Sequence, residues 1–114
     1  MDQDNQQIAM QIQKLRQQMQ NITMQKEETK QERKEIDDAI EEMEEADSDE
    51  IYKSVGNVLV SKDFNVLKEE LEERKEDLEV REKSLNKKEK QIQEKLEESQ
   101  ENLSTQMQGG GLAQ

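Results

Sequence analysis

The side chains that could carry out acid–base chemistry in this sequence of 114 residues are 29 Asp and Glu and 17 Lys and Arg. The sequence has no cysteine and no histidine, so it offers no thiol nucleophile, no disulfide and none of the usual zinc ligands. It has no glycine-rich phosphate-binding loop either. The carboxylates are spread along the chain, where we expect them to form solvated helix surfaces. We therefore predict that the protein is not an enzyme and binds neither a metal nor a cofactor.

The composition restricts the elements that could position these side chains. Only 29% of the residues are hydrophobic and 2% are aromatic, whereas 40% are charged. Such a chain cannot build a globular core, so it is either disordered or a long helical coiled coil. The absence of proline favours long uninterrupted helices.

The net charge of −12 disfavours binding to nucleic acid and to anionic membranes. No apolar run approaches the roughly 18 residues of a membrane span. The N-terminus does not resemble a signal peptide, because it is not basic and no continuous apolar run follows it. We therefore expect a cytoplasmic protein.

Apolar residues in the first part of the chain recur in steps of four and three, the pattern of a coiled-coil seam. The pattern predicts one helix over residues 5–47 that needs a partner helix to bury its stripe. The acidic run over residues 41–47 is expected to be a solvated face, with an acidic docking surface as the alternative. The predicted seam positions are Ile8, Ile12, Leu15, Met19, Ile22, Lys26, Thr29, Arg33, Ile36, Ile40 and Met43.

Residues 51–61 are rich in β-branched side chains and predict a β-hairpin. Gly56-Asn57 would form its two-residue turn, with glycine first as in a type II′ turn. Because an isolated hairpin is marginally stable in water, we expect it to pair with strands of other subunits. The alternative is a helix-connecting turn with no role in assembly. The residues predicted to carry assembly are Tyr52, Val55, Gly56, Val58, Leu59 and Val60.

A second helix is predicted over residues 64–107, with Asp63 as its N-cap and residues 108–114 as a flexible tail. Its apolar residues recur every seven positions from Leu71 to Ile92, and the spacing then shifts by one residue. The basic residues that would fill the intervening seam positions are Arg74, Arg81 and Lys88.

One antiparallel register pairs apolar residues of the two predicted helices at both ends. It pairs Ile40 with Leu71, Met19 with Ile92 and Ile8 with Leu103, and it sets the polar seam residues of the first helix against leucines. The predicted fold is therefore mainly α: a single domain over residues 1–114, with a long antiparallel two-helix coiled coil joined by a central β-hairpin. Its two ends would meet in a patch of low charge that is rich in Gln and Met, and Met suits adaptable apolar contacts.

Residues 52–60, with the sequence YKSVGNVLV between two heptad helices, resemble the β-type subunit of prefoldin, an archaeal and eukaryotic chaperone. The resemblance implies a hexamer of two α-type and four β-type subunits whose hairpins form a double β-barrel body. It also implies an ATP-independent holdase that binds unfolded client proteins at the coiled-coil tips and delivers them to a group II chaperonin. The residues expected to contact clients are Ile8, Met10, Ile12, Leu103 and Met107.

Three alternatives stay open at this point. Ile8, Ile12 and Leu103 could serve only as seam residues. The protein could be a structural or scaffolding coiled-coil subunit without client-holding activity. It could also be a prefoldin-like subunit of a different complex.

Overall fold

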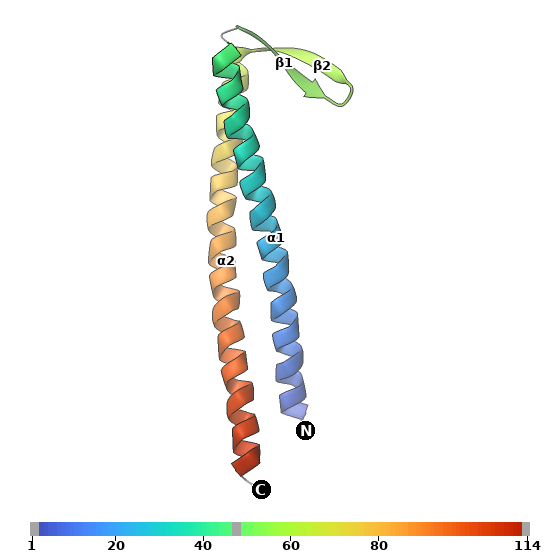
Figure 1. Cartoon of the computed structure of the whole chain (residues 1–114), viewed down its shortest axis with the longest axis vertical. Coiled ribbons are helices and arrows are strands. Elements are labelled where there is room, and N and C mark those ends of the chain that lie inside the picture. The colour runs from blue at the N-terminus through green and yellow to red at the C-terminus, as the bar shows by residue number, and fades with distance from the viewer. Residues whose placement is uncertain (1–2, 47–48, 113–114) are drawn as a thin grey trace. The chain divides into compact units, whose positions relative to one another are not determined.

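The computed structural model describes residues 3–46 and 49–112. Helix α1 (Gln3–Ala46) is followed by strands β1 (Glu50–Val55) and β2 (Val58–Asp63) and by helix α2 (Phe64–Leu112) (Figure 1). The two strands form one antiparallel sheet. The predicted fold class, two long helices joined by a central β-hairpin, is confirmed.

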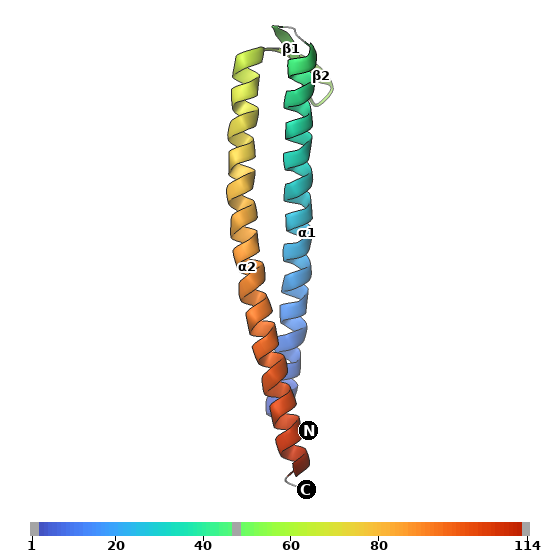
Figure 2. The ribbon, with the colours of Figure 1, turned by 60° about the vertical axis from the view of Figure 1, so that its left-hand side comes forward.

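The chain divides into two compact units. We call Met1–Lys26 with Ser84–Gln114 the terminal unit, and Glu27–Lys83 the hairpin unit. Within each unit a segment of α1 lies beside an antiparallel segment of α2 (Figures 1 and 2). Each apolar stripe is therefore buried by the other helix, which is how a chain with so few hydrophobic residues can form stable helices.

The seam predicted for α1 is confirmed at all of its positions. Each of them is buried or half-buried, and the buried ones include Thr29, which is 3% exposed. The period of the apolar residues therefore continues through the polar middle of the helix. The buried seam residues are Ile12, Leu15, Ile22, Thr29, Ile36 and Met43, and the half-buried ones are Ile8, Met19, Lys26, Arg33 and Ile40.

Part of the seam predicted for α2 is wrong. The basic residues expected between the heptad leucines are exposed, and the residue that follows each of them is half-buried instead. All six of these side chains are charged, so hydrophobicity does not distinguish the two sets. The exposed residues are Arg74, Arg81 and Lys88, and the half-buried ones are Lys75, Glu82 and Glu89.

This correction also removes the predicted change of spacing after Ile92. Ser99 is buried between the half-buried Leu96 and Leu103. With Glu82 and Glu89 as seam residues, steps of four and three alternate without a break from Leu78 to Leu103.

Glutamates of α2, rather than leucines alone, meet the polar seam residues of α1. In the terminal unit, the Lys26 ammonium lies 3.1 Å from a carboxylate oxygen of Glu89. In the hairpin unit, an Arg33 guanidinium nitrogen lies 2.9 Å from a carboxylate oxygen of Glu82. Cations on α1 therefore explain why these two glutamates, and not their basic neighbours, turn toward the seam. Such polar pairs within a seam help to specify its register.

Two further ion pairs show the antiparallel register in the hairpin unit. Lys68 lies 2.9 Å from Glu44, and Lys75 lies 2.6 Å from Asp37. The two pairs are one heptad apart on each helix and run in opposite directions along the chain. The predicted pair of Ile40 and Leu71 falls between them, as the expected register requires.

These two ion pairs predict a dependence of stability on alkaline pH. A hydrogen bond to Glu44, reinforced by the charge of that carboxylate, raises the pKa of Lys68 above 10.5, and Asp37 raises the pKa of Lys75 in the same way. Their stabilising effect is complete below pH 10.5 and is lost as the pH rises through the folded-state pKa. The melting temperature of the Lys68→Gln/Lys75→Gln variant should therefore lie slightly below that of the unmodified protein at pH 8. The gap should close above pH 10.5 in a circular dichroism titration, and a gap independent of pH would contradict the prediction.

Leu78 is the most deeply buried side chain among the described residues, at 1% exposure. Replacing it with alanine should lower the free energy of unfolding by about 2 to 5 kcal/mol, because the change removes buried apolar atoms and leaves a cavity. Val80 is 67% exposed on the same helix, and Val80→Ala should change stability by no more than about 0.5 kcal/mol. Thermal or urea unfolding of both variants measures the difference, and equal losses would show that the seam is not centred on Leu78.

The boundaries of α2 agree with the prediction at the start and differ at the end. A carboxylate oxygen of Asp63 accepts a hydrogen bond of 3.3 Å from the backbone N–H of Val66, so Asp63 is the predicted N-cap. The helix continues to Leu112 and includes residues 108–112, which were expected in the flexible tail. Extending an existing helix adds one hydrogen bond for each residue fixed, and this offsets part of the cost of glycine. Residues 113–114, and Asp47 and Ser48 at the predicted end of the first helix, lie outside the described residues.

Candidate functional site

The central hairpin has the geometry that its turn sequence predicts. Val55 pairs with Val58 next to the turn, and Glu50 pairs with Asp63 at the open end. Gly56 has a φ of 60°. This left-handed conformation is required at the first turn position of the tight hairpins that match strand twist, and glycine adopts it without steric cost.

Alternation along the paired strands gives the hairpin two apolar faces. Val55, Val58 and Val60 share one face, because Val55 pairs with Val58 and Lys53 pairs with Val60. Tyr52 and Leu59 lie on the other face. All five side chains are between 40% and 69% exposed. The hairpin therefore exposes apolar side chains on both faces, and no element of the described chain covers them.

The open end of the hairpin is attached to α2 by charge pairs. The ammonium of Lys62 lies 3.3 Å from a carboxylate oxygen of Glu70, and that of Lys53 lies 4.0 Å from the other oxygen. Both lysines lie on the same face as the valines, since they occupy alternate positions on paired strands. Ile51, which shares this face, is half-buried and lines a small hollow with Met43 and Leu67. These contacts fix the base of the hairpin and leave its turn end accessible.

A second apolar surface lies in the terminal unit, where the first turns of α1 meet the last turns of α2. The two helices form an open groove there of about 620 Å³, which we call the end groove. Its lining is mainly apolar and includes one charged side chain, Arg16. The residues that line it are Ala9, Ile12 and Arg16 of α1 and Gln100, Leu103, Ser104 and Met107 of α2.

The end groove brings together three of the five residues expected to contact clients. Ile12 forms its buried floor, Leu103 is half-buried, and Met107 is 55% exposed. The other two expected residues do not line it. Ile8 is half-buried at a seam position, and Met10 is 70% exposed on the surface of α1.

Four residues of the groove were missed at the level of sequence: Ala9, Arg16, Gln100 and Ser104. Each lies three or four positions from a predicted contact residue on its own helix, so it occupies the same helix face. This spacing is the feature of the sequence that places the four residues on the groove-lining faces of the two helices. Hydrophobicity does not mark these four positions, because three of the side chains are polar and the fourth is small.

The described residues offer no metal-binding arrangement that would compete with these surfaces. No group of carboxylates within residues 3–46 and 49–112 is placed to hold a metal ion. Neither of the described helices is long and apolar enough to cross a membrane. The two apolar surfaces are therefore the candidates for function.

The fold defines a helical coiled-coil protein with a β-hairpin between its two helices. Comparison with protein families matches residues 6–110 to the prefoldin subunit family. Comparison with solved structures finds the crystal structure of the prefoldin beta subunit from Thermococcus strain KS-1. It is 31% identical, the match covers 91% of this chain and 92% of that chain, and the TM-score is 0.81. A search of curated proteins finds no match.

The chain belongs to the prefoldin family and is of the β type. Prefoldin is a family of non-enzymatic chaperones whose subunits assemble with other prefoldin subunits into hetero-oligomers. This membership agrees with the absence of a catalytic motif in the sequence, and it confirms the resemblance seen in residues 52–60.

Proposed function

We propose that this β-type subunit is part of an ATP-independent holdase that binds unfolded proteins in its end groove and delivers them to a group II chaperonin. In this proposal two α-type and four β-type subunits form a cytoplasmic hexamer through their hairpins. The observation that carries the proposal is the end groove, an open and mainly apolar surface at the ends of both helices.

The chemistry of the groove suits a client that has no fixed shape. Met107 is exposed at its edge, and a thioether on a flexible chain can adapt to many apolar side chains. Ile12 and Leu103 supply an apolar floor that is held in place by the seam. Binding to apolar groups without a defined shape is what recognition of unfolded chains requires, since these expose hydrophobic side chains that native proteins bury.

The hairpin supports the assembly part of the proposal. Its two faces expose Val55, Val58 and Val60 on one side and Tyr52 and Leu59 on the other. A two-stranded hairpin with uncovered apolar faces and free edges gains stability when strands of other subunits pair with it. Gly56 contributes by allowing the tight turn that holds β2 in register.

The proposal is tested by measuring how the complex reconstituted with an α-type subunit affects aggregation of a chemically denatured client. We expect light scattering to be suppressed without ATP, and the held client to refold when a group II chaperonin and ATP are added. An intact complex that leaves aggregation unchanged would refute the holdase function and favour a scaffolding role. Suppression without transfer would refute only the delivery step.

A further inference from the structure

We propose that Arg16 makes the end groove selective for apolar client segments that carry an acidic residue. The inference rests on the proposed function, because it names the class of client sequence that the groove prefers. It would make Arg16 a specificity-determining residue within a surface whose other described residues are uncharged.

Among the described residues that line the groove, Arg16 is the only one with a charged side chain. The other polar residues of the lining, Gln100 and Ser104, are neutral. The described lining therefore supplies no carboxylate to offset the charge of the guanidinium group.

Arg16 also has no partner among the described side chains. Within residues 4–46 and 49–107, whose side chains the structure describes, no ion pair and no side-chain hydrogen bond joins it to another residue. Lys26 and Arg33 of the same helix differ in this respect, since Lys26 is paired with Glu89 and Arg33 with Glu82. Arg16 therefore presents its donors to whatever occupies the groove.

The guanidinium group of Arg16 has the chemistry to bind a carboxylate. It is planar, always charged, and able to form two parallel hydrogen bonds to one carboxylate. A client segment with an Asp or Glu beside its apolar residues could place the carboxylate on Arg16 and the apolar side chains on Ile12, Leu103 and Met107. A segment with Lys or Arg at that point would place a second cation beside Arg16, with no carboxylate among the described lining residues to compensate.

The net charge of the whole chain disfavours acidic clients, whereas Arg16 favours them, so the two effects can be told apart. At −12, the protein repels acidic clients at long range. Screening limits such effects to about 8 Å at physiological salt, so inside the groove the nearby cation dominates. A general electrostatic effect would therefore favour basic clients, and only a local effect of Arg16 favours acidic ones.

The experiment compares two fluorescent peptides that share one apolar core and are flanked by either Asp or Lys. Binding to the assembled complex is measured by anisotropy. The unmodified protein should bind the acidic peptide about two- to fivefold more tightly, as for a solvent-accessible ion pair. Arg16→Glu should reverse the order, and Arg16→Lys should keep it. Lys14→Gln is the matched control: it removes a positive charge from an exposed residue of α1 that does not line the groove, and it should leave the preference unchanged.

The outcomes of these binding measurements distinguish the role of Arg16 from the role of the groove as a client site. Equal binding of both peptides, or a preference that survives Arg16→Glu, would overturn the role of Arg16 while leaving the holdase function intact. Failure of both peptides and of the uncharged core to bind would refute the groove as a client site. Growth of the complex with protein concentration, together with loss of peptide binding, would show that a second copy of the chain occupies the groove.

Discussion

Replacing both Val58 and Val60 with aspartate is expected to dissociate the assembled complex into single subunits. The two valines lie on one face of the hairpin with Val55, and both are substantially exposed in the isolated chain. If strands of neighbouring subunits cover this face, the carboxylate at position 58 is buried opposite Val55, without a cationic partner. The carboxylate at position 60 is buried opposite Lys53, which already pairs with Glu70. Burial of an unpaired charged group costs at least about 3 kcal/mol, so the substitution at position 58 alone should weaken association more than a hundredfold.

Sizing chromatography with light scattering measures this effect directly. The matched control is Val66→Asp/Val80→Asp, which makes the same change at two exposed valines of α2, 49% and 67% exposed, in the same unit. The control should remain assembled, and circular dichroism should show unchanged helix content in both proteins. A hairpin variant that elutes as the full complex would refute the role assigned to Val58 and Val60.

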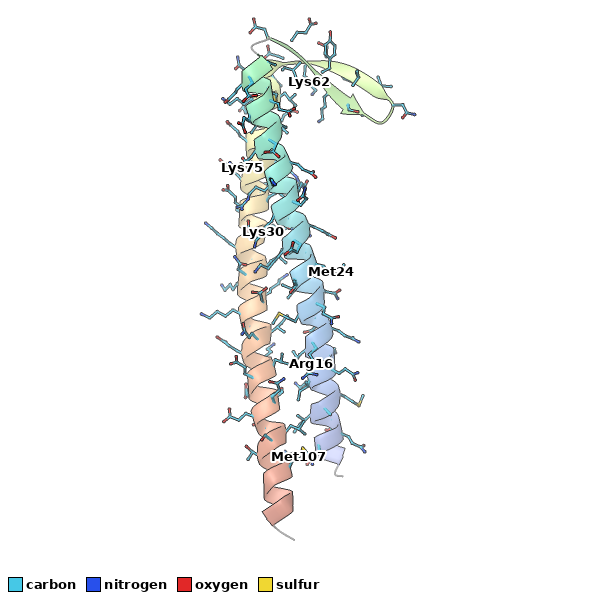
Figure 3. All side chains as sticks on the ribbon, in the orientation of Figure 1. Arg16, Met24, Lys30, Lys62, Lys75 and Met107 are labelled. Atoms are coloured by element: carbon cyan, nitrogen blue, oxygen red, sulfur yellow. The ribbon has the colours of Figure 1, made fainter. Side chains whose placement is uncertain are left out.

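Replacing Met107 with aspartate is expected to abolish most client holding and leave assembly unchanged. Met107 lies on α2 and lines the end groove, where its side chain is 55% exposed (Figure 3). Burying a methionine side chain against a client contributes about 1.5 to 3 kcal/mol, and a carboxylate at the same point would lose that energy. We therefore expect at least about tenfold more complex to be needed for half-maximal suppression of aggregation.

Met24 provides the matched control for this substitution. It belongs to α1 in the same unit, is 60% exposed, and does not line the end groove (Figure 3). Met24→Asp introduces the same charge with the same loss of a thioether, so it should retain full holding activity. Equal impairment of the two variants would show that the added negative charge, rather than the groove, is responsible. Equal activity would show that clients bind elsewhere.

Periodicity and local chemistry determined much of this structure from the sequence. The steps of four and three in α1 predicted every buried or half-buried seam position from Ile8 to Met43, including Thr29. A glycine at the first turn position predicted the hairpin, and Asp63 predicted the cap of α2. These features depend on interactions within one helix or one turn, or on a repeating contrast between apolar and polar residues. Such information is contained in the order of the residues.

The seam of α2 could not be predicted completely from the sequence. Between its leucines both candidate positions are charged, so no hydrophobic contrast marks the buried one. Glu82 and Glu89 occupy the half-buried positions because cations of α1 lie opposite them. Arg33 pairs with Glu82 in the hairpin unit, and Lys26 pairs with Glu89 in the terminal unit. Only the packing of the second helix supplies that information.

The set of residues that line the end groove likewise depends on the tertiary structure. Its lining comes from residues 9–16 and 100–107, which are far apart in the chain and meet only when the helices pair. The sequence identified the apolar residues Ile12, Leu103 and Met107, because hydrophobicity is a property of single residues. It did not identify Arg16, because the absence of an ion-pair partner for it among the described side chains depends on which residues of the other helix lie opposite.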